Sequence, residues 1–93
     1  MEVHIEESDT KGRAFVGSSD GPQAEMTYSR AGDALLIIDH TEVDDSLRGT
    51  GAGRFLLDSV VALARERGVK ILPLCPFARS QFEKDASIRD VLR

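Results

Sequence analysis

Arg48-Gly49-Thr50-Gly51-Ala52-Gly53 is the stretch of this chain that decides its fold. Three glycines stand at alternate positions behind an arginine, between a strongly apolar run and a helical pattern. Glycine lets backbone N–H groups turn toward a ligand where a Cβ would block its approach. A helix that begins inside such a loop adds unpaired N–H groups and a partial positive charge. The stretch therefore predicts a cradle for an anion, and phosphate or diphosphate is its natural occupant.

The segments on either side of the loop predict a β-α-β unit. Residues 34–43 form a strand that is apolar in its first half, as expected of a central strand covered on both faces, and polar in its second half. Residues 50–67 follow a helical period, and Gly68 is a suitable residue to end that helix. Residues 69–74 form the next strand, parallel to the first because a helix separates the two. The predicted apolar face of the helix consists of Phe55, Leu56, Val60, Leu63 and Ala64.

Outside this unit the chain predicts hairpins at its beginning and short helices at its end. Alternating or apolar runs at residues 3–7, 14–16 and 24–29 indicate three strands, and residues 78–84 and 87–92 favour short helices or turns. The expected fold is α/β, with a mixed, mostly antiparallel sheet of about five strands and one main helix after the fourth strand. We expect one domain over residues 1–93, with the loop at the carboxyl end of the fourth strand, where open sheets bind ligands.

Composition narrows the possible partners of the chain. Its 12 basic and 16 acidic residues give a formal net charge of -4, which argues against general nucleic-acid binding. A single cysteine excludes an intramolecular disulfide and gives no sign of an oxidising compartment. The N-terminal residues lack the pattern of a signal peptide, and the longest apolar run, residues 34–38, is too short to span a bilayer. We therefore expect a cytoplasmic protein with no membrane or nucleic-acid partner.

Two common phosphate-binding motifs do not fit the loop. A Walker A loop requires a lysine and then Ser or Thr after its last glycine, whereas Arg54 follows Gly53 here. A dinucleotide fingerprint requires a glycine at its sixth position and an acidic residue about 20 positions further on. Counted from Gly49, the sixth position is Arg54, and Val69-Lys70-Ile71 offers no acid.

The loop does fit the pattern Arg/Gln-x-x-Gly-x-Gly/Ala, and in this it resembles the acetyl-CoA diphosphate loop of the GNAT N-acetyltransferases. The order of strand, loop, helix and strand is similar too. The chain resembles most closely a small group of minimal GNAT-like proteins of the YjdJ type, which implies a truncated GNAT fold. The matching segments are His40-Thr41-Glu42-Val43, the glycine loop, Ala64-Arg65 with Gly68 and Lys70, and Pro73-Leu74-Cys75-Pro76-Phe77.

The resemblance implies that the chain binds acetyl-CoA. Val43 and its neighbours would pair with the pantetheine arm like an extra strand, and the side chains of Arg48 and Arg54 would contact phosphates. Phe77 and Phe82 would pack against the cofactor. The alternatives are a tight turn, solvated arginines and phenylalanines that belong to the core. The backbone N–H groups that would hold the diphosphate are those of Gly49, Thr50, Gly51, Ala52, Gly53 and Arg54.

Three side chains are candidates for catalysis. Cys75 lies just beyond the last strand, where its thiolate would accept the acetyl group if a positive charge or a helix N-terminus stabilised it. His40 and Glu42 lie on one face of their strand, and either would remove a proton from an amine. The alternatives are a packed cysteine, a hydrogen-bonded histidine and a solvated carboxylate. One cysteine and two distant histidines show no metal-ligand spacing.

Two departures from the GNAT pattern bear on function. The chain has no room for the helices between the first two strands or for the further strands that usually shape the acceptor site. That site is then open, or a partner or a second copy in a homodimer completes it. Related chains tend to carry His-Pro where this one has Asp85-Ala86. Three functions stay open: acetyl transfer from acetyl-CoA to an amine of unknown identity, CoA binding with little or no catalysis, and a structural interaction domain with a vestigial loop.

Overall fold

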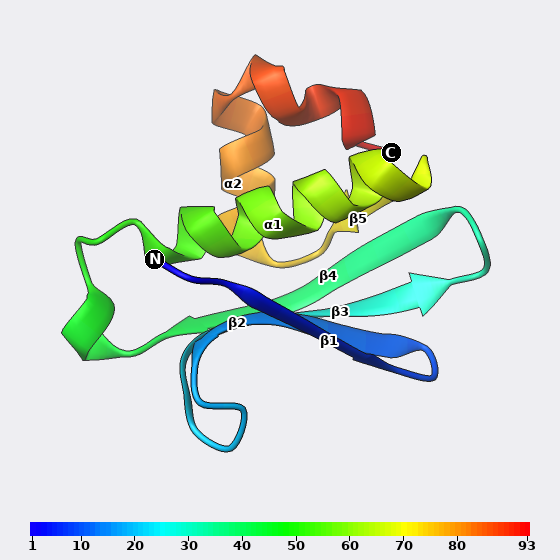
Figure 1. Cartoon of the computed structure of the whole chain (residues 1–93). Coiled ribbons are helices and arrows are strands. Elements are labelled where there is room, and N and C mark those ends of the chain that lie inside the picture. Colours follow the sequence, from blue (N-terminus) through cyan, green and yellow to red (C-terminus); the bar gives the residue numbers. More distant parts are fainter.

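The computed structural model describes residues 1–93 and contains a five-stranded sheet with two α-helices on one of its faces (Figure 1). This confirms the predicted fold class. The strands are β1 (His4–Ser8), β2 (Lys11–Gly17), β3 (Pro22–Ala31), β4 (Leu35–Val43) and β5 (Lys70–Pro73). The helices are α1 (Ala52–Arg67) and α2 (Pro76–Lys84), with two 3₁₀ helices, η1 (Asp45–Leu47) and η2 (Ala86–Val91).

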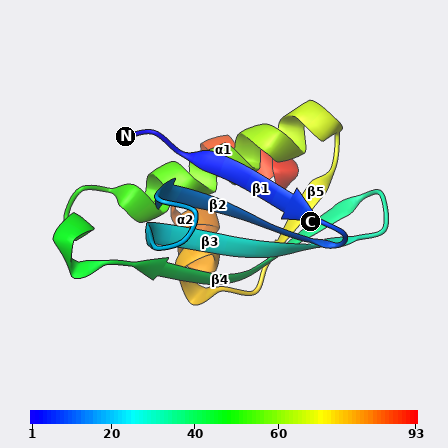
Figure 2. The ribbon, with the colours of Figure 1, turned by 60° about the horizontal axis from the view of Figure 1, so that its bottom comes forward.

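The strands lie side by side in chain order. The pairs from β1 to β4 are antiparallel, whereas β4 and β5 are parallel, as the intervening helix α1 requires. Figure 2 shows the sheet in front and both α-helices behind it, so the opposite face of the sheet carries no helix. None of the helices combines the length and the apolar character that crossing a membrane demands.

The buried face of α1 is turned relative to the predicted one. Phe55 was expected in the core, yet its side chain is 46% exposed, and Leu63 is only half-buried. At 100° per residue, Phe55 shares a row with Ala62 and Glu66 on the outer side of the helix. The side chains that α1 buries are Ala52, Leu56, Leu57, Val60, Val61 and Ala64.

Glycines in the left-handed conformation set both ends of α1. The helix begins at Ala52 rather than at Thr50, because Gly51 has a φ of 81° and interrupts the helical backbone. At the other end, Gly68 has a φ of 68°, and its N–H donates to the carbonyls of Ala64 and Arg65. This end confirms the predicted glycine cap.

A polar cluster ties the edge strand β1 to the end of α1. Both carboxylate oxygens of Glu7 accept hydrogen bonds from Arg67 at 2.8 Å, and Tyr28 Oη donates to Glu7 at 2.5 Å. The bonds from Arg67 and, less strongly, from Tyr28 outweigh the burial of this carboxylate and lower the pKa of Glu7 from 4.5 to about 2. Burial, followed by the neighbouring carboxylate, raises the pKa of Tyr28. Gly12 makes room for this ring, since an added Cβ would lie 2.4 Å from Tyr28 Cζ.

Candidate functional site

The glycine loop presents a row of unpaired backbone donors. Thr50 is an exception, because its N–H donates to the carbonyl of Leu47 at 3.2 Å and is not free for an anion in this conformation. Unpaired N–H groups at the start of a helix form a site for an anion. The N–H groups that find no acceptor within the chain are those of Gly49, Gly51, Ala52, Gly53 and Arg54.

The three glycines of the loop are required for different reasons. Gly49 and Gly51 have φ values of 78° and 81°, which strain any residue with a Cβ. Gly53 is helical, but an added Cβ would lie 2.9 Å from Cζ of Phe77. The third glycine therefore allows α1 to pack closely on α2, whereas the first two shape the loop.

An unpaired edge of β4 runs toward the loop. β5 pairs only with Leu35–Ile38, and the carbonyl of Ile38 then accepts the N–H groups of Leu74 and Cys75 at 3.0 and 3.2 Å as the chain turns away. The segment Asp39–Val43 has no neighbouring strand on that side. A bulge at Asp39 accompanies this separation, because Tyr28 pairs with Ile38 and Thr27 already with His40.

The backbone of this edge faces a groove. The N–H of Asp44 donates to the carbonyl of Gln23 at 2.7 Å, so the alternating groups of Val43 and Thr41 point away from β3. They adjoin a groove of about 380 Å³ between the strand, the glycine loop and Phe77. The groove thus joins a strand edge, which can pair with an extended amide chain, to a cradle for an anion. Its lining residues are Thr41, Val43, Leu47, Arg48, Gly49, Gly51, Ala52, Gly53 and Phe77.

The side chains of the two arginines of the loop, Arg48 and Arg54, differ in their interaction partners. Arg48 is 80% exposed, and its only ion pair is with Asp45 at 3.0 Å. Arg54 instead donates to Asp58 at 2.8 Å, to Gln81 at 3.0 Å and to Asp85, and its bonds to Asp58 and then to Asp85 raise its pKa. Its guanidinium therefore links α1 to Gln81 of α2 and to Asp85, the residue that follows α2. Only its backbone N–H faces the cradle, so the prediction that its side chain contacts phosphates finds no support in this geometry.

Cys75 immediately precedes α2 and lies next to Thr41, which lines the groove. Its side chain is 4% exposed, and Sγ lies 3.2 Å from Oγ1 of Thr41, which is its only side-chain hydrogen-bond partner. Cys75 is the N-cap residue of α2, so a helix N-terminus lies beside the thiol. Phe77 lines the groove from the first turn of α2, whereas Phe82 is 2% exposed and belongs to the core.

His40 and Glu42 form a pair on the other face of β4. His40 Nε2 lies 3.0 Å from Glu42 Oε1, which confirms that the two side chains share a face, and both are well exposed. Successive side chains of a strand point to opposite faces, and Thr41 between them turns toward Cys75. The structure therefore brings Cys75 to Thr41 and His40 to Glu42, but places the two pairs on opposite faces of the strand.

Some features of the site carry no clear signal in the sequence. Thr41 lies between the candidate residues His40 and Glu42, and only the fold shows its contact with Cys75. No glycine or proline near Asp39 predicts the bulge there. Asp85 carries a local signal, a Ser two positions on for an N-cap, but its pairing with Arg54 spans 31 residues.

The fold and the site together define an α/β domain of the acetyltransferase class, with a glycine loop at the end of a strand that separates from its parallel neighbour. Residues 13–91 match the family model of the GCN5-related N-acetyltransferases. The chain belongs to this family. A comparison with curated proteins found no match.

Solved structures agree with this assignment. The solution structure of a GCN5-like candidate N-acetyltransferase from Staphylococcus aureus is 37% identical, with a TM-score of 0.76 over 97% of this chain and 87% of that one. Two more distant structures share the fold: a ribosomal-protein-alanine N-acetyltransferase from Brucella melitensis, at 18% identity, and the ribosomal-protein-S18-alanine N-acetyltransferase from Escherichia coli, at 17%. Their TM-scores are 0.66 and 0.67 over 83% and 84% of this chain, which spans only 62% and 53% of theirs.

Proposed function

We propose that this chain transfers an acetyl group from acetyl-CoA to an amine acceptor. The observation that carries the proposal is the junction of five unpaired N–H groups with the unpaired edge of β4. A CoA thioester has the matching chemistry, because its diphosphate is an anion and its pantetheine arm contains amides that pair with a strand edge. The family to which the chain belongs supports the same reaction class.

The residues present fit this cofactor. The unpaired N–H groups of Gly49, Gly51, Ala52, Gly53 and Arg54 would hold the diphosphate. Thr41 and Val43 would pair with the pantetheine amides. Arg48 is free to approach a phosphate, since its one ion pair is fully exposed. When bound, acetyl-CoA supplies the acetyl group as an activated thioester.

Two routes remain for the chain's own catalytic groups. In the first, Cys75 carries the acetyl group, but no acid or base contacts its Sγ, and Thr41 supplies only a hydroxyl. In the second, an amine attacks directly, and His40 or Glu42 accepts its proton on the open face of the sheet. Because His40 and Glu42 lie on the face of β4 opposite Thr41 and Cys75, the proton of the amine would reach this exposed pair through water around the free edge of the strand.

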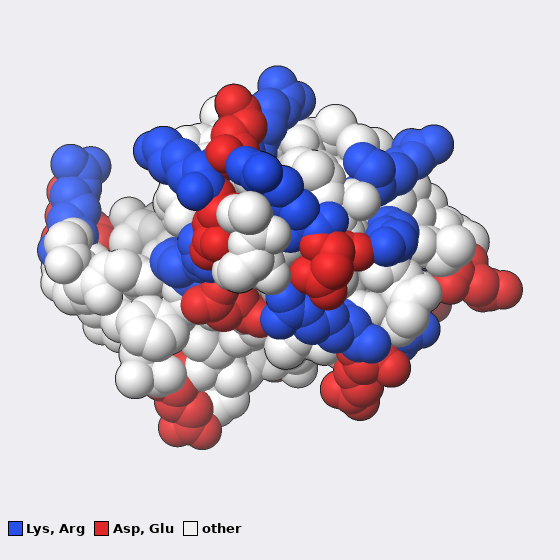
Figure 3. All heavy atoms as spheres, turned by 90° about the horizontal axis from the view of Figure 1, so that it is seen from above, with Lys and Arg blue, Asp and Glu red and all other residues white.

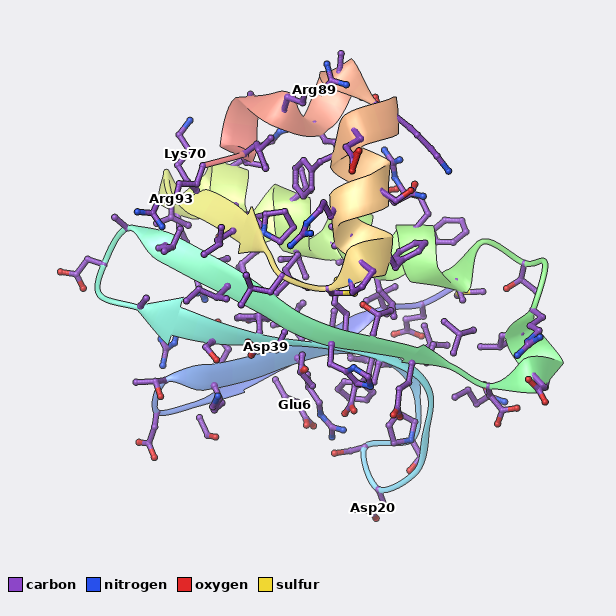
Figure 4. All side chains as sticks on the ribbon, turned by 180° about the vertical axis from the view of Figure 1, so that it is seen from behind. Glu6, Asp20, Asp39, Lys70, Arg89 and Arg93 are labelled. Atoms are coloured by element: carbon purple, nitrogen blue, oxygen red, sulfur yellow. The ribbon has the colours of Figure 1, made fainter.

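The charge distribution also suits an amine. Residues 1–51, which form β1 to β4 and the loop, contain eleven acidic and four basic residues, whereas residues 52–93 contain five acidic and eight basic ones. Figure 3, which views the helical side, shows Lys and Arg outnumbering Asp and Glu over the helices. Figure 4 shows Glu6, Asp20 and Asp39 away from the helices, on the sheet side of the molecule. Arg13 pairs with Glu6 and Glu25, whereas Asp39 and Glu42 on β4 add negative charge that would attract a protonated amine.

Calorimetric titration with acetyl-CoA tests the cofactor. The native chain should bind saturably, and Gly51→Glu should abolish binding because it places a carboxylate in the cradle. Gly32→Glu is the matched control, since Gly32 also has a positive φ of 63° and open space around it, but lies in the turn between β3 and β4. Circular dichroism should show that both variants fold. A native chain that does not bind acetyl-CoA would overturn the proposal.

Mass spectrometry and turnover separate the two routes. If Cys75 carries the acetyl group, incubation with acetyl-CoA adds one acetyl mass that Cys75→Ala loses. If the direct route holds, Cys75 stays unmodified, Cys75→Ala keeps its turnover with an amine, and His40→Ala with Glu42→Gln loses it.

A CoA-binding module with little catalysis is the second candidate. The observation that favours it is the face of the sheet without helices, so no helix covers the acceptor side of β4 (Figure 2). Binding of acetyl-CoA without turnover across a broad panel of amines would support this function instead. We also propose, from the resemblance in sequence, the YjdJ-type subgroup, a single cytoplasmic domain and a possible completion of the acceptor side by a second copy.

A further inference from the structure

Phe55 places a large exposed aromatic ring beside the glycine loop. It lies in the first turn of α1, and its N–H donates to the carbonyl of Gly51 at 3.1 Å. Its Cε2 would lie 3.9 Å from a Cβ added at Gly51, and the residue is 46% exposed. The ring is therefore a neighbour of the unpaired N–H groups and not a part of the core.

The packing of α1 gives no reason for an aromatic residue at this position. The row that continues from Phe55 along the helix contains Ser59, Ala62 and Glu66, which are small or polar. A single exposed apolar residue is common on protein surfaces, so exposure alone carries no conclusion. The position of the ring at the rim of the cradle is informative, because an extended ligand held by the loop has to leave the cradle past this rim.

The path of the ligand follows from the two ends of the groove. A CoA thioester with its diphosphate on the loop and its arm along β4 would direct its acyl end toward Thr41. The nucleotide end would then leave on the outer side of the loop, since Phe77 packs against Gly53 on the inner side. Arg48 and Phe55 are the exposed large side chains next to that exit.

We propose that the ring of Phe55 is a stacking platform for the adenine base of CoA, so that the site recognises the nucleotide as well as the thioester arm. The inference rests on the proposed function, because it requires a CoA-type ligand on the glycine loop. Purine bases stack on aromatic side chains through their apolar faces, and no hydrogen bond is needed. Arg48 at the same rim adds positive charge for the phosphate groups next to the base.

Calorimetry with two ligands tests the proposal. CoA contains the adenine nucleotide, whereas 4'-phosphopantetheine contains only the arm and one phosphate. Phe55→Ala should weaken CoA binding by about 5- to 150-fold and leave the affinity for 4'-phosphopantetheine unchanged. Phe55→Tyr should bind CoA like the native chain, because it keeps the ring. The matched control is Ile5→Ala, another exposed apolar residue, which lies on β1 and should change neither affinity.

Each remaining outcome counts against the proposal in a distinguishable way. If Phe55→Ala binds CoA as tightly as the native chain, the platform is absent while the proposed function stands. If Phe55→Ala weakens both ligands equally, the ring acts by shaping the loop and does not bind the base. If the native chain binds no CoA, the proposed function fails and this inference fails with it.

Discussion

Replacing Glu7 by Gln should destabilise the protein by breaking the link between its first strand and its main helix. Glu7 receives two hydrogen bonds from Arg67 and one from Tyr28, and together they lower its pKa from 4.5 to about 2. Such a shift corresponds to about 3 kcal/mol without screening. The side chain of Arg67 is 37% exposed, so solvent weakens the pair, and we expect a loss of about 1–2 kcal/mol.

The effect should depend on pH with a definite sign. Because the pKa of Glu7 is lower in the folded state, its contribution is complete above pH 4.5 and disappears as the pH falls toward 2. Glu7→Gln should therefore be less stable than the native protein at pH 7, by roughly 4–16 °C in Tm, and the two should converge in acid. Glu66→Gln is the control, since Glu66 is exposed and has no ion pair.

Urea unfolding followed by circular dichroism and tyrosine fluorescence measures this difference. Tyr28 is the only tyrosine, and the chain has no tryptophan, so the fluorescence reports on this cluster. A free energy of unfolding for Glu7→Gln within about 0.5 kcal/mol of the native value at pH 7 would refute the reasoning. So would a deficit that stays constant from pH 7 to pH 3.

Three further predictions concern the groove and its supports. Gly53→Ala should lose about 1–2 kcal/mol in free energy of unfolding in urea, because the clash of the new Cβ with Phe77 exceeds the gain in helix propensity. Adding Phe77→Leu should restore the stability. A single variant as stable as the native protein would contradict the contact between Gly53 and Phe77. Asp85→Asn should lower the Tm, less so in high salt, because it frees Arg54; an equal loss at all salt concentrations argues against an ion pair. Cys75 should react slowly with Ellman's reagent in the native protein and rapidly in urea, and equally rapid native labelling would contradict its burial.

The periodicity of the sequence was enough to predict the architecture. The apolar run in β4, the helical period of α1 and the apolar residues of β5 are local patterns that favour one secondary structure each, and a helix between two strands makes them parallel. The glycine loop could be placed between them for the same reason. Gly68 marked the end of α1 correctly, because a left-handed glycine cap is a local feature too.

The details that the sequence did not predict depend on contacts between distant segments. Phe55 fits a helical period on either of two faces, and the packing of Leu57 and Val61 against the sheet decides which one is buried. Arg54 has the charge of a phosphate ligand, but its partner Asp85 comes within reach only once α2 is folded. Several of the predicted cofactor-binding residues line one groove, while the separation of Cys75 from His40 required the faces of β4 to be known.

The contact between Gly53 and Phe77 has a consequence for which ligands the groove can accept. Phe77 is two residues from Cys75, so the same first turn of α2 touches the anion cradle and follows the thiol. The packing of α2 against α1 therefore sets the distance between the cradle and the thiol. An arm of the wrong length would leave its acyl carbon short of Cys75 or beyond it, however well its phosphates bind. For a thioester bound as proposed, the length of the arm between phosphate and acyl carbon would therefore decide which ligands fit.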